Sequence, residues 1–471
     1  MSRRTMDPVR ALAAIDDRGW LVGGALRDRL LGRDTSDFDV VVEGRPEPLA
    51  QALARNAGGH AFELSQGFGA WRVVSRERTW QLDLLPLAER RIEDDLARRD
   101  LTVNAIGQPL SSEQLIDPFG GLDDLHDRTL RMVAADAFIL DPLRTLRLAR
   151  LACELGFRIE PETAAVATRS APALEHVAPE RVFAELKRII CAEQAVEGLR
   201  LMDQLGVTAI VLPELSALHG VEQSPYHHLD VHEHTLAVVM AAIELERDPE
   251  LALGDRAGEV SEFLSTPLAN ELTRWQALRL GALLHDIAKP RTRQLTEDGR
   301  VTFIGHDAVG AQMALAMLSR LRTSERLGEH VAALTRHHLR LGFLVHAMPL
   351  TRREIYRYLH ESSPVQVDVT VLSVADRVAT RGVRSAEAIA KHLELARQLL
   401  GEGLRWVADP PRPPIRGDEL ARALDVRPGP ELGRILRELE EASYAQEIRS
   451  RDEAVQRARE LLGDGSIGSA R

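Results

Sequence analysis

Residues 21–44, LVGGALRDRLLGRDTSDFDVVVEG, form the segment that decides the fold. Two adjacent glycines, a basic helical stretch and an Asp-x-Asp pair lead into a run of valines. Valine-rich runs favour strands, and strand residues two apart face the same side of a sheet. Asp37 and Asp39 are therefore predicted to present both carboxylates to one site.

This pair of carboxylates predicts a divalent cation. Hard oxygen ligands suit Mg²⁺, which keeps waters and binds substrate phosphates beside one or two carboxylates. Gly23 and Gly24 precede the helical stretch, where backbone N–H groups and Arg27 favour a phosphate. Asp83, between two leucines, is a candidate third acid. These groups predict a nucleoside triphosphate site, while a tight turn beside a solvated strand edge is the alternative interpretation.

The composition restricts the class of protein. A chain of 471 residues predicts several domains, and from its residue pattern we expect no membrane span and no signal peptide. Cys153 and Cys191 form no CxxC motif, so we expect no disulfide framework, no thiolate zinc site and a cytoplasmic location. The net charge of −11 argues against attraction of nucleic acid by the whole surface, although a local basic stripe remains open.

The sequence pattern changes near residue 140. Residues 20–135 mix short β-branched runs with helical stretches, which predicts an α/β unit with a mixed sheet. The remainder has apolar residues at three- and four-residue spacing, which predicts an all-α region. Eleven of the 16 histidines fall between His219 and His346 and indicate a second functional unit.

Several motifs follow one another in a fixed order. After GGALRD and DFDVVV come DLARRDLTVNAI (95–106), IDPFGGLDDLHDRTLRMV (116–133), DPLRTLRLAR (141–150) and PERVFAELKRI (179–189). Together they resemble the polymerase-β-like nucleotidyltransferases and, within them, the class II tRNA nucleotidyltransferases. Enzymes of this family build the 3′ CCA end of tRNA without a template.

The resemblance implies roles for individual residues. Asp37 and Asp39 would hold magnesium with help from Asp83, and an Asp and an Arg would recognise the base edge through fixed acceptors and donors. The base readers are Asp141 and Arg144; the nucleotide-binding set also includes Gly23, Gly24, Arg27, Arg99, Asp100, Asn104, Arg147 and Arg150. Glu180, Arg181 and Glu185 would be structural or orienting residues.

The histidine-rich region carries GALLHDIAKP, which resembles the HD phosphohydrolase superfamily. The resemblance implies a metal site of His234, His285, Asp286 and Asp376, with His306 and His337 as ligands of a possible second metal. Imidazole and carboxylate together suit Mn, Fe, Co, Ni or Zn, and such a metal would activate water against a phosphate ester. The other histidines nearby, namely His227, His228, His232 and His338, are not needed for that site, and structural histidines are the alternative.

The resemblance also implies a domain order. A nucleotidyltransferase head (1–139) would precede a helical neck (140–218), an HD domain (219–395) and a helical tail (396–471). CTP and ATP would be the nucleotides, and neck and tail would grip the acceptor stem and elbow of tRNA. The sequence does not predict an oligomeric state.

Two departures from the family pattern affect the product. Leu140 stands where the family has Glu beside the base-reading Asp. Only PLAERRIEDDLA separates QLDLL from RRD, where full CCA-adding relatives carry a longer flexible loop. This shortening resembles the CC-adding subgroup and favours addition of two cytidines, with full CCA addition left open.

Three other functions compete with tRNA nucleotidyl transfer. Poly(A) polymerase is a close relative, but FGAWRVV replaces its more basic stretch. An HD phosphohydrolase with an N-terminal nucleotide sensor and a catalytically silent RNA-binding protein are the others.

Overall fold

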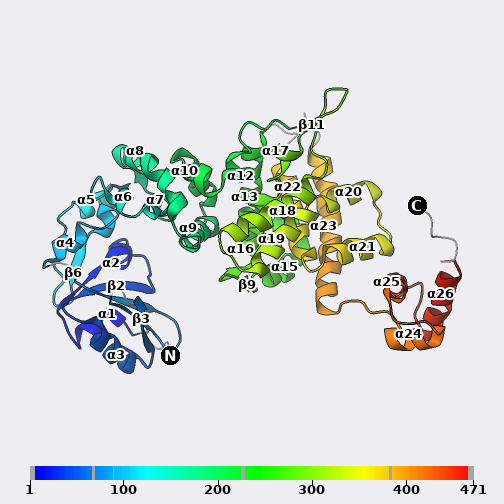
Figure 1. The fold of residues 1–471 in the computed structure, drawn as a ribbon, viewed down its shortest axis with the longest axis horizontal. Helices are drawn as coiled ribbons and strands as arrows, with labels where there is room; N and C mark the ends of the chain where they lie inside the picture. The colour runs from blue at the N-terminus through cyan, green and yellow to red at the C-terminus, as the bar shows by residue number, and fades with distance from the viewer. Residues whose placement is uncertain (1–5, 66–68, 88–89, 224–228, 381–384, 465–471) are drawn as a thin grey trace. The chain divides into compact units, whose positions relative to one another are not determined.

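The computed structural model describes residues 6–65, 69–87, 90–223, 229–380 and 385–464. The chain divides into two compact units, Met1–Val211 and Leu212–Arg471, which are described separately (Figure 1). The finer division into head, neck, HD domain and tail stays a prediction. Among the described residues, no helix has the length and apolarity that a membrane span requires.

The first unit contains a six-stranded sheet in the order β3-β4-β5-β2-β1-β6. β2 and β5 run parallel, whereas the other neighbours are antiparallel, so the predicted mixed sheet is confirmed. The strands are β1 (Gly19–Val22), β2 (Asp37–Val42), β3 (His60–Ser65), β4 (Ala70–Val74), β5 (Gln81–Pro86) and β6 (Gly107–Pro109).

Short helices lie between these strands. They are α1 (Pro8–Ala13), α2 (Gly23–Leu30), α3 (Pro46–Ala57), α4 (Ile92–Leu96), the 3₁₀ turn η1 (Thr102–Asn104) and α5 (Gly121–His126). Strands and helices share a buried core of Val22, Val41, Ile92, Leu96 and Ala105. This core fixes the ends of β1 and β2, where the glycines and the carboxylates lie.

The rest of the first unit is helical apart from β7 (Thr129–Leu130) and β8 (Arg158–Ile159). Its helices are α6 (Ala137–Leu140), α7 (Leu143–Leu155), α8 (Pro161–Ser170), η2 (Ala171–His176), α9 (Pro179–Cys191), α10 (Ala195–Gln204) and α11 (Val207–Val211). α7 packs against both α9 and α10 and buries its apolar face there. The change of pattern near residue 140 therefore marks a real change to helical structure.

The second unit begins with a bundle of helices, among which α13, α16, α19 and α22 pack on one another. Its helices and turns are α12 (Pro213–Ser216), α13 (Val231–Arg247), α14 (Glu250–Leu253), η3 (Gly254–Arg256), α15 (Ala257–Leu264), α16 (Arg274–Leu284), α17 (Lys289–Thr292), α18 (His306–Arg320), α19 (Glu325–His337), α20 (Arg340–Leu344), η4 (Val345–Ala347), α21 (Arg352–Ser362), α22 (Gln366–Ala379) and α23 (Ser385–Ala408). Two small hairpins complete it, β9 (Pro267–Ala269) with β10 (Leu272–Thr273) and β11 (Gln294–Leu295) with β12 (Val301–Thr302).

The last three helices, α24 (Gly417–Leu424), α25 (Pro430–Tyr444) and α26 (Arg451–Asp464), share a small core of their own. α25 contacts α21 largely through charged and polar groups. Arg353 bonds Glu438 at 2.9 Å and holds Glu447 through two contacts of 2.7 Å. Tyr356 donates from its hydroxyl group to Glu440 at 2.9 Å. The C-terminal helices are therefore attached to the bundle by ion pairs, together with ring contacts of Tyr444 with Tyr356 and Trp406.

A fully buried carboxylate in the bundle provides a stability test. Asp368 on α22 is 0% exposed and pairs with Arg274 on α16 at 2.6 Å. Arg274→Met would remove this cationic partner and leave the carboxylate beside the imidazole of His330 at 3.4 Å, so we expect a loss of about 3 kcal/mol of unfolding free energy. Urea unfolding followed by circular dichroism measures the change. The double variant Arg274→Met/Asp368→Leu should regain most of the loss, and equal instability of both variants would contradict this account.

Candidate functional site

The parallel pairing of β2 with β5 brings three carboxylates together. Asp39 lies directly opposite Asp83, and Asp37 lies opposite Gln81, whose amide donates to the Asp37 carboxylate at 3.0 Å. Because residues two apart share a face, Asp37, Asp39 and Asp83 occupy the same side of the sheet. The sequence analysis predicted this arrangement for the first pair and named Asp83 as a candidate third acid.

Asp83 differs from the other two acids in its partner. Arg72 on the neighbouring strand β4 donates from Nε and Nη2 to its two oxygens, both at 2.7 Å. Such a two-pronged pair is geometrically specific and holds the carboxylate in one orientation. Asp83 is thus oriented by Arg72, whereas the other two acids face the site without such a clamp. Arg72 was missed from the sequence because only the β4–β5 register places it opposite Asp83.

The electrostatics of Asp39 fit a bound cation. Burial raises the pKa of this carboxyl group, and the charges of Asp37 and Asp83 raise it further. A divalent cation would relieve this repulsion, and the donor set of carboxylate oxygens is the one magnesium prefers. Asp37 and Asp39 are therefore the residues that could hold it.

Gly23 provides space at the same site. It is the first residue of α2, with φ +70°, so the adjacent glycines form the first helical turn instead of preceding it. A Cβ atom here would lie 2.8 Å from Nη1 of Arg99 and 3.1 Å from Oδ2 of Asp39. Only glycine allows the helix start, the arginine and the carboxylate to approach this closely.

Four of the predicted nucleotide-binding residues form one continuous polar chain. Nη1 of Arg27 donates to Oδ1 of Asn104 at 2.7 Å, and Nδ2 of Asn104 donates to Asp100 at 2.9 Å. Nε of Arg147 lies 3.0 Å from the other oxygen of Asp100. Burial opposes the charge of Asp100, but Arg147 and Asn104 outweigh it and lower the pKa of this carboxyl group. The chain connects α2, η1 and α7.

The two predicted base readers lie at the start of α7. Arg144 donates to the backbone oxygens of Arg98 at 2.7 Å and Ala137 at 3.1 Å. Asp141 accepts from the backbone N–H of Leu143 at 3.2 Å and from Nη2 of Arg181 at 2.8 Å. Both side chains are therefore held in fixed orientations, as reading a base edge requires.

Leu140 lies directly before this pair of residues and is 62% exposed. An apolar side chain therefore stands at the surface where the family pattern has Glu.

Arg150 does not belong to this group, which corrects the prediction that it holds phosphate. Its side chain is buried and pairs with Glu154 at 2.8 Å and with Glu185 of α9. The spacing of three residues from Arg147 suggested a shared face, but the packing of α9 on α7 covers this part of the helix. Arg150 holds two helices together.

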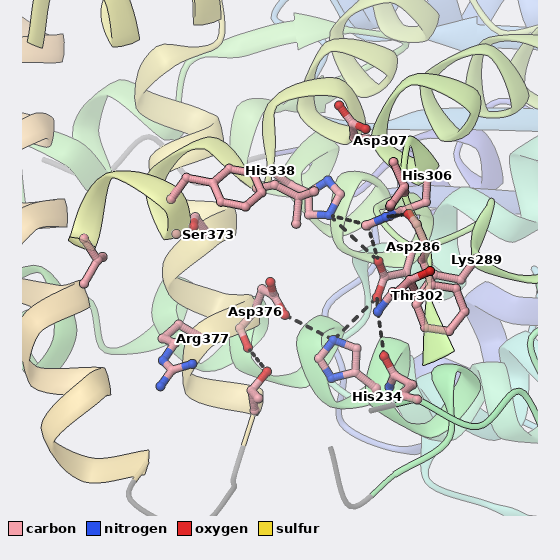
Figure 2. A pocket seen from close by; sticks show the side chains of 18 of the residues that line it. His234, Asp286, Lys289, Thr302, His306, Asp307, His338, Ser373, Asp376 and Arg377 are labelled. Carbon is pink, nitrogen blue, oxygen red and sulfur yellow. Dashed lines mark hydrogen bonds and ion pairs between the residues drawn. The ribbon is translucent and has the colours of Figure 1, made fainter. Parts of the chain in front are cut away.

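A second group of candidate residues lies in the second unit, around Asp286. His234 on α13 lies 3.1 Å from Asp376 on α22 and 3.7 Å from Asp286. His285 approaches Asp286 at 3.1 Å. The ligand atoms of His234, His285 and Asp286 lie within 4.8 Å of one another, and Figure 2 shows the labelled members converging. Buried imidazole and carboxylate donors at these distances fit a transition metal.

A second triad shares Asp286 and consists of Asp286, His306 and His338. Nε2 of His306 lies 3.2 Å from Asp286 and 3.3 Å from Nε2 of His338. Burial lowers the pKa of His338 to about 4, so its imidazole is neutral near pH 7, the form that binds metals.

The prediction named His337 instead of His338, and the structure corrects it. Nδ1 of His337 accepts from Nε of Arg340 at 2.8 Å, and His337 is not a member of the triad. Adjacent histidines on a helix point about 100° apart, and only the packing of α19 determines which one faces inward.

The two triads open into a cavity of about 690 Å³. Its wall combines cationic, hydroxyl and apolar groups around the acids and imidazoles, including Lys289, Thr302, Phe303, Ile304, Phe343, Ser373 and Arg377 (Figure 2). Ile304 and Phe343 are 79% and 70% exposed. A phosphate ester with an organic substituent matches this lining.

The sequence matches three family models in the expected order. They are "Poly A polymerase head domain" over residues 19–131, "Probable RNA and SrmB- binding site of polymerase A" over 156–218 and "HD domain" over 231–381. The first two names alone would leave poly(A) polymerase open as an alternative.

Relatives that match along most of the chain resolve this choice. The A-adding tRNA nucleotidyltransferase of Deinococcus radiodurans is 36% identical over 92% of this chain and 93% of that protein. The CC-adding tRNA nucleotidyltransferase of Thermus thermophilus is 36% identical over 92% and 91%. The Multifunctional CCA protein of Xanthomonas campestris pv. campestris (strain B100) is 32% identical over 73% and 78%. The chain belongs to the tRNA nucleotidyltransferase family and is a nucleotidyltransferase.

Solved structures show the same fold. A CCA-adding enzyme with ATP aligns with a TM-score of 0.64 at 19% identity, covering 97% of this chain and 96% of that chain. A Thermotoga maritima CCA-adding enzyme with tRNA aligns at 0.59 and 20%, covering 98% and 97%. At such low identity the likeness supports the fold class alone.

The different environments of the acids predict different effects of substitution. Asp39→Asn removes a charge from the cation site, so we expect nucleotidyl transfer to fall by about a thousandfold or more. Asp83→Asn, whose side chain can still bond Arg72, should cost less. Single-turnover CTP incorporation measures both rates, and a larger loss from Asp83→Asn would contradict the assignment.

Proposed function

We propose that the first unit adds two cytidines to the 3′ end of tRNA and then stops. The observation that carries this proposal is the short connection between β5 and α4, which leaves only residues 87–91 between Pro86 and Ile92. Ala88 and Glu89 of this connection lie outside the described residues. A segment this short cannot form the long flexible loop that the resemblance associates with the change from CTP to ATP.

Different residues of the first unit would hold the metal and the triphosphate. Magnesium held by Asp37 and Asp39 would activate the tRNA 3′-hydroxyl and neutralise the leaving pyrophosphate. Asp83, whose carboxylate Arg72 holds in one orientation, adds negative charge beside this site. The N–H groups at the start of α2 face the triphosphate, where Gly23 allows a close approach.

Base selection depends on the start of α7. Cytosine presents an amino donor beside two acceptors along its pairing edge. The Asp141 carboxylate accepts from the amino group, and the Arg144 guanidinium donates to the acceptors. Because backbone carbonyls and Arg181 already orient these two side chains, the protein supplies the fixed pattern that a template strand would otherwise provide.

The CC-adding and A-adding relatives are equally similar to this chain, so product length is the decisive measurement. Purified protein, magnesium, CTP and ATP are incubated with transcripts that end before CCA, after C and after CC. We expect two additions on the first, one on the second and none on the third. Three additions would establish full CCA addition, and extension of the CC-ending transcript alone would establish A addition. No extension of any transcript would refute nucleotidyl transfer to tRNA.

We also propose that the cluster around Asp286 is a metal-dependent phosphohydrolase centre. His234, His285, Asp286 and Asp376 would hold one transition metal, and Asp286, His306 and His338 could hold a second. Such a metal activates water for attack on phosphorus. The support is the convergence of buried imidazole and carboxylate donors beside a cavity that also contains cationic side chains.

The two proposed activities should be separable by mutation. His285→Ala removes a ligand and should lower hydrolysis of p-nitrophenyl phosphate by about a hundredfold, because a lost ligand weakens metal binding. Incorporation of CTP should not change in this variant. Asp39→Asn serves as the reciprocal control, since it should retain hydrolysis and lose transfer. Loss of both activities in either variant would contradict two independent centres.

A further inference from the structure

Lys289 occupies an unusual position for a cation. It is the first residue of α17, is only 8% exposed and places Nζ 2.7 Å from Oδ2 of Asp286. Nε2 of His285 approaches the same oxygen at 3.1 Å and Nε2 of His234 at 3.7 Å. The ammonium group therefore contacts the carboxylate oxygen toward which two imidazole ligands converge.

A metal ion bound to Oδ2 of Asp286 would lie near the ammonium group of Lys289. A carboxylate oxygen binds a transition metal at about 2.0–2.2 Å and Nζ lies 2.7 Å from this oxygen, so an ion bound to it would lie within about 5 Å of Nζ. Two positive charges at such short range repel each other strongly in a buried site. The ion and Lys289 therefore compete for Asp286.

In the metal-free centre, Lys289 is a cationic partner of the Asp286 carboxylate. The carboxylate is buried, and the ammonium group of Lys289 lies 2.7 Å from its Oδ2 atom. A buried carboxylate without a cationic partner is strongly destabilising. Lys289 thus stabilises the metal-free centre.

Lys289 also has other partners on the cavity wall. Nζ donates to Oε1 of Gln223 at 2.6 Å and lies 5.4 Å from the centre of the Phe303 ring. All three residues line the same cavity as the metal ligands, and Figure 2 labels Lys289 beside Asp286. The flexible four-carbon stem of lysine allows the ammonium group to leave Asp286 and remain in the cavity.

We propose that Lys289 is an internal counter-ion that a metal displaces toward the substrate. In the metal-free centre it balances Asp286 and lowers the affinity for metal. When a metal binds, the released ammonium group turns into the cavity and binds a phosphate oxygen of the ester. This inference rests on the proposed phosphohydrolase centre and gives Lys289 a positioning role in it.

The test measures metal affinity directly, apart from catalysis. Full-length protein is stripped with a chelator and titrated with Mn²⁺ by isothermal calorimetry. Lys289→Met keeps the length of the side chain and removes its charge, so Mn²⁺ should bind about tenfold more tightly. Lys289→Arg keeps the charge and serves as the matched control, with an affinity close to that of the wild type. With saturating Mn²⁺, Lys289→Met should raise KM for p-nitrophenyl phosphate about tenfold and change kcat less.

Each alternative outcome has a distinct meaning. Equal Mn²⁺ affinity of wild type and Lys289→Met overturns the counter-ion role, and equal tightening in Lys289→Arg overturns it by assigning the effect to packing. Absence of Mn²⁺ binding by the wild type overturns the phosphohydrolase centre itself, and this inference with it. Circular dichroism verifies folding, and Lys289→Gln replaces the methionine variant if that protein does not fold.

Discussion

The partnership between buried Asp100 and Arg147 determines the geometry of the first unit. A carboxylate in this position requires a cation, and the cation comes from α7, the helix that also carries Asp141 and Arg144 at its start. The same carboxylate connects through Asn104 to Arg27 on α2, which begins beside Asp39. One desolvated charge therefore keeps the base-reading groups in register with the acids of β2.

The second unit also contains a buried carboxylate, but side chains of other kinds surround it. Asp286 is buried like Asp100, but imidazoles and one lysine surround it instead of arginines. Arginine cannot be deprotonated and does not bind metals, so the arginines of the first site suit phosphates, whereas its carboxylates suit a hard cation. Imidazole binds softer metals. The difference in partner separates the proposed nucleotide site from the proposed transition-metal site within one chain.

Much of this architecture follows from sequence, and the exceptions have physical reasons. The strand at DFDVVV was predicted, whereas the three residues of β6, Gly-Gln-Pro, carry no strand pattern. The structure corrects the roles of Arg150, whose partner Glu185 lies far along the chain, and of His337, whose side chain is turned toward Arg340 by the rotation of α19. Arg72 lacked a signal because only strand register reveals its partner.

The ion pairs that attach the last three helices affect how the salt dependence of RNA binding should be interpreted. Arg353 joins α21 to α25 through several glutamates, and these contacts lie partly in solvent. Salt weakens such pairs and also weakens protein–phosphate contacts. If these helices touch RNA, a plot of affinity against ionic strength would combine two equilibria. Its slope would then overstate the number of ions released from the nucleic acid.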